Sequence, residues 1–314
     1  MLWCFSSMDE EIKYKYFKAG EIAALARDKG VEKVKTGASL LEVATYIESL
    51  IYSNNAKPAF PVNIARNHIA AHFTPNPKNT QVFKKGDLVK IDVGAHIDGY
   101  IADTAVTVEV DTDVHSSLCD ASNEALKHAI KMMKPGVSLS KIGETVEKTI
   151  TSYGFKPIEN LTGHSLNRFV LHAGLSIPNV PSINLLKKPH VDDVIAIEPF
   201  ATDGYGRVIS GKGSNIYIAQ ASKSLRGLRE KRSKLQIKRI KKEFNSLPFA
   251  FRWCEKLFSN AEVSIQRLTY LNLLHHFPQL IEQNNGMVSQ KEHTVIVTEN
   301  GCEITTLGKN EEVI

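Results

Sequence analysis

The sequence has few cysteines, and no stretch of it is apolar enough to cross a membrane. Its four cysteines lie far apart and form no Cys-x-x-Cys pair, which argues against a disulfide framework and against a cysteine-ligated zinc. No apolar run approaches the roughly 18 residues that a membrane-spanning helix needs. The first residues lack a basic leader and are too short for a signal peptide. The four cysteines are Cys4, Cys119, Cys254 and Cys302. Together these absences predict a cytoplasmic protein without a membrane segment.

Acidic residues are scarce in one segment, residues 223–242. This segment holds ten Lys or Arg residues and one acid, Glu230, so it carries +9 while the whole chain carries +5. Such a charge density would suit a surface for RNA and hence contact with ribosomes. The simpler explanation, which the pattern favours, is a solvated helix whose Lys and Arg stems cover an apolar row at Leu225, Leu228 and Leu235.

Two stretches of the chain resemble each other at an offset of 99 residues. Lys35-Thr-Gly-Ala-Ser-Leu40 matches Lys134-Pro-Gly-Val-Ser-Leu139, and apolar residues follow each at helical spacing. Asp87-Leu-Val-Lys-Ile-Asp92 then matches Asp193-Val-Ile-Ala-Ile-Glu198, and Asp-Gly-Tyr follows both. We therefore predict an α+β fold built from two halves, each with helices followed by a β-hairpin and related by pseudo-twofold symmetry.

The pattern changes after Tyr217. Residues 223–285 read as mostly helical, with helices expected at 223–243, near 248–258 and at 264–275, and strand character returns at Thr294-Val-Ile-Val-Thr298. We predict that residues 1–222 and 286–314 form one catalytic domain. Residues 223–285 would be a helical, winged-helix-like subdomain inserted into it.

Two carboxylates flank the first predicted hairpin. An Asp98-Gly99 turn pairs residues whose numbers sum to 197, so Asp92 faces Ala105 and Asp103 faces Gly94. Asp92 and Asp103 are then diagonal neighbours, roughly 7–8 Å apart at Cα, and would repel unless they were protonated or bound to cations. The alternative is a solvated hairpin face with two unrelated surface acids.

Three more residues could act as metal ligands. Glu198 lies in an apolar run at the position equivalent to Asp92, Glu292 precedes the returning strand, and His164 follows Gly163. A buried acid needs a partner, but a single histidine is more often a hydrogen-bonded structural residue. None of the three residues is decisive alone.

Taken in order, these motifs resemble the pita-bread metallopeptidases. The motifs are Asp92-Val-Gly, Asp103-Thr-Ala, Gly163-His-Ser, Ile197-Glu-Pro and Glu292-His-Thr. Ala59-Phe-Pro-Val-Asn63, Ala70-Ala-His-Phe-Thr-Pro75, His172-Ala-Gly and the insertion before Glu292 narrow the resemblance to type 2 methionine aminopeptidases. Leu247-Pro-Phe-Ala250 with Arg252-Trp253 resembles their archaeal members. The resemblance covers residues 8–314.

The resemblance implies a pita-bread fold that holds two divalent ions, for which Co, Mn, Fe and Zn are all candidates. Asp103 and Glu292 would bridge the ions, Asp92 would bind one, and His164 and Glu198 the other. A hydroxide between the ions would attack the peptide bond after the initiator methionine. Glu198 would pass a proton to the departing amine, while His72 and His172 would hydrogen-bond to the scissile amide and the oxyanion. Phe60, Leu171 and Ile216 would form the methionine pocket.

The sequence departs from this family at two places. Lys291 stands where similar sequences often carry an aromatic residue before the last ligand, and we expect its side chain to point away from the site. Residues 1–7 precede Met8, where family members begin, so we expect a mis-assigned start or a dispensable extension.

Proteins of this fold can have two other functions. An aminopeptidase of this fold that cleaves before proline would keep all five ligands, although the His72 motif and the insertion argue against it. A non-catalytic homologue that binds RNA or ribosomes would be expected to lose ligands, and none is lost here. We therefore expect a monomeric enzyme that acts on N-terminal Met peptides and nascent chains.

Overall fold

The computed structural model describes residues 8–183, 186–220, 230–309 and 311. The first seven residues, predicted to be an extension, and residues 223–229 of the basic segment lie outside this range. Among the described helices, none has both the length and the hydrophobicity required to cross a membrane.

The first half of the chain folds as two helices against an antiparallel sheet. Helix α1 (Glu10–Val31) packs across β4 (Leu88–Ile97) and β5 (Tyr100–Glu109). Helix α2 (Leu40–Ser53) begins where Ser39 accepts a hydrogen bond from the backbone N–H of Glu42, as an N-cap residue does. β1 (Lys57–Pro58) and β2 (Asn63–Arg66) pair with β4 along its other edge, and β3 (Ile69–Ala71) follows.

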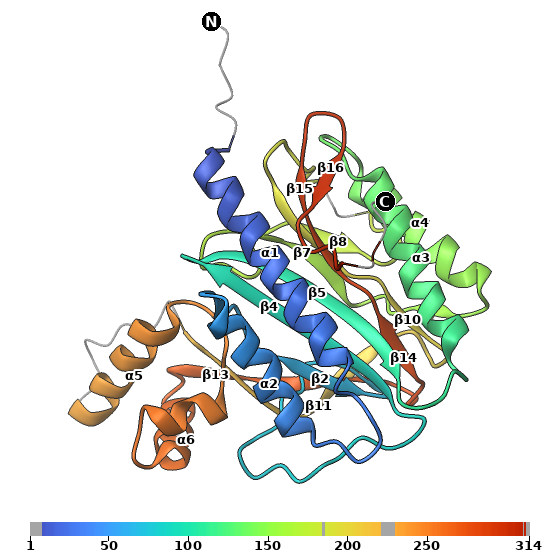
Figure 1. Cartoon of the computed structure of the whole chain (residues 1–314). Helices are drawn as coiled ribbons and strands as arrows, with labels where there is room; N and C mark the ends of the chain where they lie inside the picture. Colours follow the sequence, from blue (N-terminus) through green and yellow to red (C-terminus); the bar gives the residue numbers. More distant parts are fainter. Residues whose placement is uncertain (1–7, 184–185, 221–229, 310, 312–314) are drawn as a thin grey trace, which may run out of the picture.

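The second half repeats this order. Helices α3 (Ser116–Met132) and α4 (Leu139–Ser152) precede the short strands of this half, and α4 begins at the predicted residue. One sheet has the order β16-β15-β9-β7-β8, and a smaller sheet has the order β14-β10-β6. In Figure 1 these helices lie on the side of the molecule away from α2, as expected for two related halves. The strands are β6 (Lys156–Pro157), β7 (Thr162–Leu166), β8 (Ser176–Pro178), β9 (Val194–Ile197), β10 (Phe200–Thr202), β14 (Val288–Gln290), β15 (His293–Val297) and β16 (Cys302–Ile304).

The predicted hairpin register is confirmed. Asp98 and Gly99 both have positive φ, which is the backbone of a type I′ turn, and Asp92 pairs with Ala105 while Gly94 pairs with Asp103. A Cβ atom at Gly94 would lie 2.2 Å from the ring of Phe60. Glycine is therefore required here, because the Phe60 ring packs against the sheet between the two aspartates.

Residues 223–285, called here the inserted segment because an insertion is predicted there, are less helical than predicted in the part from residue 230 onward. Its described helices are α5 (Lys231–Phe244), the 3-10 helix η1 (Phe251–Lys256) and α6 (Ala261–Tyr270); α5 and α6 lie together at one end of the molecule (Figure 1). The helix expected at 264–275 is wrong at its end, because Asn272 turns left-handed and strand β13 (Leu274–Glu282) begins two residues later. β13 pairs with β11 (Val208–Ala219) and β3, and β12 (Phe249–Ala250) pairs with β11.

Candidate metal centre

The five predicted ligands converge on one cavity of about 290 Å³. Asp92 and Asp103 come from the β4–β5 hairpin, His164 from β7, Glu198 from the residue after β9, and Glu292 from the residue before β15. Glu292 pairs with Ala105 of the first half, while its neighbour His293 pairs with Ile197 of the second half. The chain at Glu292 therefore joins the sheets of the two halves and brings their acids together.

The distances between these side chains suit an interposed cation. The Nε2 atom of His164 lies 3.8 Å from Oδ2 of Asp103 and 3.7 Å from Oε1 of Glu198, too far for hydrogen bonds. One ligand atom each from Asp103, His164 and Glu292 lie within 4.8 Å of one another. A divalent ion bound at roughly 2.0–2.2 Å from each atom would fit between them.

The electrostatics of the cavity favour a cation as well. Burial raises the pKa of Asp92 to about 7, and burial together with the neighbouring carboxylates raises the pKa values of Asp103, Glu198 and Glu292 well above their usual range. The Oδ1 atoms of Asp92 and Asp103 are buried and have no hydrogen-bond partner among the described residues. Four carboxylates this close leave a buried excess of negative charge that divalent ions would neutralise.

Two further histidines reach the cavity without joining the carboxylate cluster. His72 has φ of +61°, and burial lowers its pKa to about 4, so it is neutral at pH 7. Its Nδ1 atom is buried and has no hydrogen-bond partner in the described part of the chain, and its ring meets that of Phe277 edge-on at a centroid distance of 5.6 Å. His172 meets the ring of His164 edge-on at 4.3 Å, and burial lowers its pKa. Both are placed to contact a molecule in the cavity.

The remaining wall of the cavity is largely apolar. Phe60, Leu171 and Ile216 all line it, as do the five predicted metal ligands and the two predicted catalytic histidines. The sequence analysis missed Phe169, Ile218, Pro248 and Phe277. Ile218 was detectable by strand alternation from Ile216. Phe277 was not, because its segment was predicted to lie outside the catalytic domain.

Lys291 does not line this cavity. Its ammonium group forms an ion pair with the carboxylate of Glu311, which also accepts a hydrogen bond from Arg27 at 2.7 Å. The side chain therefore points away from the ligands, as expected for the residue next to Glu292 in an extended chain.

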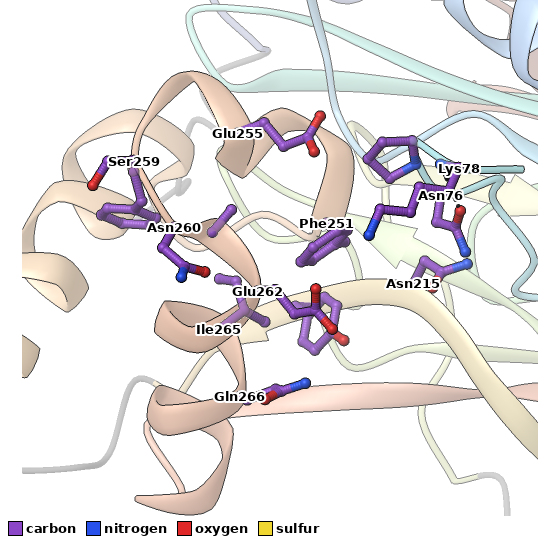
Figure 2. Close-up of a pocket in the computed structure, with 14 residues that line it drawn as sticks. Asn76, Lys78, Asn215, Phe251, Glu255, Ser259, Asn260, Glu262, Ile265 and Gln266 are labelled. Atoms are coloured by element: carbon purple, nitrogen blue, oxygen red, sulfur yellow. Dashed lines mark hydrogen bonds between the residues drawn. The ribbon is translucent and has the colours of Figure 1, made fainter.

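A second, larger hollow of about 470 Å³ lies between the inserted segment and the loop at 76–78. Figure 2 shows Lys78, Asn76 and Asn215 on one side of it and Glu255 and Glu262 on the other. It shares no lining residue with the metal cavity. Its lining mixes acids, one lysine and amides, and it contains none of the five predicted metal ligands, so the candidate metal centre is the smaller cavity.

Comparisons with known proteins agree with this geometry. The profile described as metallopeptidase family M24 matches residues 15–299. A methionine aminopeptidase of Methanocaldococcus jannaschii is 43% identical over 299 residues, which are 95% of this chain and 100% of that protein. The crystal structure of a methionine aminopeptidase from Thermotoga maritima superposes with a TM-score of 0.69 at 25% sequence identity. The superposition covers 96% of this chain and 98% of the Thermotoga chain.

A thermophilic Arx1 structure has a TM-score of 0.83 and covers 98% of this chain and 93% of its own. At 18% identity it shows that the fold is shared and no more. The family match, by contrast, spans all five predicted ligands. The chain therefore belongs to metallopeptidase family M24, and within it to the pita-bread enzymes called type 2 methionine aminopeptidases.

Proposed function

We propose that this chain is a metal-dependent aminopeptidase that removes the N-terminal methionine from peptides and nascent chains. The observation that carries the proposal is the cluster of four buried carboxylates and His164 beside an apolar wall, in a chain that is 43% identical to a methionine aminopeptidase. A free N-terminal residue is small enough to enter a cavity of about 290 Å³.

Asp92, Asp103, His164, Glu198 and Glu292 are proposed to hold two divalent ions. Their oxygen-rich donor set with one imidazole suits Mn, Fe, Co or Zn and does not select among them. When bound, such ions would lower the pKa of water towards neutrality and polarise the peptide carbonyl.

The protein's own side chains would do the remaining work. Glu198 accepts a hydrogen bond from Nε2 of Gln290 at 3.1 Å, which holds its carboxylate in place to accept a proton and deliver it to the leaving amine. His72 and His172 are proposed to form hydrogen bonds to the scissile amide and to the oxygen on which charge develops. Phe60, Leu171 and Ile216 would contact the methionine side chain.

The first experiment measures methionine released from a Met-Ala-Ser peptide by metal-stripped protein as Mn(II), Fe(II), Co(II) or Zn(II) is added. An Ala-Pro peptide is the control, because an enzyme that cleaves before proline would carry the same ligands. Metal-dependent release from the methionine peptide alone is expected. Folded, metal-binding protein that releases no methionine with any ion would refute the proposal.

Contact with ribosomes is a separate part of the proposal. The described part of the basic segment exposes Lys231, Arg232, Lys238 and Arg239 on α5, near an exposed Leu235. Such a surface would bind ribosomal RNA through phosphate contacts, with a strong dependence on salt. Binding to purified ribosomes should weaken when the Lys and Arg residues of 231–242 are neutralised, and an unchanged salt response would argue for a merely solvated helix.

We also propose that the protein acts in the cytoplasm and as a monomer. Residues 1–222 and 286–314 would form its catalytic domain, into which residues 223–285 are inserted as a subdomain. Leu280 and Ile281 within this range pair with β3, so the proposed subdomain and the catalytic domain would share a sheet. Size measurement in solution would test the monomer, and limited proteolysis would locate the boundary.

A further inference from the structure

Asn63 is a buried amide in the wall of the metal cavity. Only 4% of it is exposed, and it lies on β2 directly opposite Asp92. Side chains of directly paired residues project to the same face of a sheet, with Cβ atoms roughly 4.5–5.5 Å apart. The Asn63 side chain is therefore the next neighbour of an acid in the carboxylate cluster.

The orientation of this amide is fixed by its hydrogen bonding. Its Nδ2 atom lies 3.1 Å from the backbone oxygen of Pro61, which can only accept a hydrogen bond. The nitrogen must therefore face Pro61, and the Oδ1 atom must face the other way. Oδ1 is buried and receives no hydrogen bond from any described residue. An unpaired buried acceptor costs about 1–3 kcal/mol, so a donor from outside the protein is expected here.

The neighbours of Asn63 limit the kind of donor. Asp92 beside it accepts hydrogen bonds when ionised, and Phe60, three residues earlier, offers an apolar ring to the same cavity. A ligand that suits both has an apolar side chain and an amino group attached to the same carbon atom. An N-terminal methionine has this combination, and its α-amino group is lost when the N-terminus is acylated.

We propose that Oδ1 of Asn63 accepts a hydrogen bond from the α-amino group of the substrate, which makes Asn63 a specificity-determining residue for a free N-terminus. The inference rests on the proposed function, since it assumes that an N-terminal methionine occupies the cavity. It assigns a role to a residue that is not one of the proposed metal ligands.

The test compares the binding of L-methionine and of 4-(methylthio)butanoic acid, which has the same side chain and carboxylate but no amine. Both affinities are measured by calorimetry on metal-loaded protein, so turnover is not needed. The wild type should prefer methionine. Asn63→Ala should reduce that preference by about tenfold or more, as expected for a hydrogen bond to a charged group, with little change in binding of the acid.

Ser246→Ala is the matched control, because Ser246 also lines the cavity but its hydroxyl already donates to the backbone oxygen of Phe169. This variant should keep the wild-type preference. Asn63→Ser serves as a second variant if the alanine variant does not fold, since its shorter side chain cannot place an oxygen at the same point.

Three outcomes would overturn the inference. If Asn63→Ala keeps the preference for methionine, the amine does not contact Asn63. If Asn63→Ala instead weakens the binding of Mn(II) or Co(II) more than tenfold, the amide oxygen is a metal ligand. If the wild type itself shows no preference for methionine, the proposed function fails together with the inference. In the first two outcomes the wild type keeps its preference, so only the role of Asn63 fails.

Discussion

Two clusters of buried charged side chains lie on opposite sides of the chain at residues 291–293. Asp92, Asp103, Glu198 and Glu292 form the carboxylate cluster, and Arg27, Lys291, His293 and Glu311 form the ion-pair cluster. Burial raises the pKa of each acid in the carboxylate cluster. Burial also acts to raise the pKa of Glu311, but the positive charges of Arg27 and Lys291 outweigh it and hold that pKa well below its usual range.

The difference indicates that the carboxylate cluster is a binding site, whereas the ion-pair cluster stabilises the fold. In the ion-pair cluster each charge has an opposite partner, so the cluster is complete without a ligand. In the carboxylate cluster the charges have the same sign and two oxygens have no partner among the described residues, so the cluster is complete only with cations. Removing one acid should therefore have opposite effects on the stability of the metal-free protein in the two clusters.

The largest effect is expected from Asp103→Asn. Loss of a carboxylate that the ions need should lower methionine release by on the order of 10³-fold or more, since a bound metal contributes several kcal/mol to the reaction. The metal-free variant should unfold at the same temperature as the wild type or higher, because a repulsive charge is gone. Calorimetry with and without metal checks both, and a large loss of metal-free stability would break the comparison.

His72→Ala tests whether a residue of the same cavity can matter without holding metal. Turnover of the Met-Ala-Ser peptide should fall about 10²–10³-fold, as for the loss of a hydrogen-bond donor in a reaction centre. The affinity for Mn(II), followed by calorimetry, should stay the same because His72 lies outside the ligand cluster. A parallel loss of bound metal would contradict the proposed role.

In the ion-pair cluster, Glu311→Gln should destabilise the fold by about 3 kcal/mol, because it leaves Lys291 buried without its partner and leaves Arg27 with Asp28 alone. Urea unfolding measures the change. The matched control is Glu303→Gln, which breaks a half-exposed ion pair with Lys13 and should cost less than about 1 kcal/mol. Equal effects of the two substitutions would show that burial of the pair has no energetic consequence.

The pH dependence of metal affinity follows from the carboxylate cluster alone. In the metal-free protein the pKa of Asp92 is about 7, so below that pH a bound ion must displace at least one proton. The affinity for Mn(II) should therefore fall as the pH is lowered from 8 to 6, by about tenfold per pH unit for each proton displaced. His164 adds nothing to this slope, because burial lowers its pKa to about 3 and it stays neutral. Calorimetry in buffers of different ionisation enthalpy would count the protons.

The sequence predicted the carboxylate cluster and not the ion-pair cluster, for a physical reason. An Asp-Gly turn fixes the register of its hairpin locally, so the places of Asp92 and Asp103 followed from short-range rules. The start of α2 at Leu40 likewise follows from its Ser39 cap and apolar spacing, and the start of α4 at Leu139 follows from apolar spacing. Glu311 and Arg27 are separated by 284 residues, and only the complete fold brings them together.

The error in the inserted segment has the same origin. β13 is held by pairing with β11 and β3, and burial along it does not alternate regularly. The β11–β13 pairing contains two register irregularities. Phe277 therefore could not be assigned to the cavity wall from the sequence. Ligand types and turns are readable from sequence, whereas partners across distant strands are not.

The smallest effect is expected at Lys291, a member of the ion-pair cluster that directly precedes Glu292 of the carboxylate cluster. Lys291→Met removes a cation beside Glu292 but keeps the length of the side chain, and burial already lowers the pKa of Lys291. The ammonium group pairs with Glu311 on the far side of the chain, so the affinity for Mn(II) should change less than about tenfold. Replacing a residue that orients a metal ligand usually reduces metal affinity by about tenfold or more. Calorimetric titration of both proteins with Mn(II) gives the comparison. A larger change would mean that the charge of Lys291 reaches the metal cavity, and that the two clusters act as one electrostatic unit.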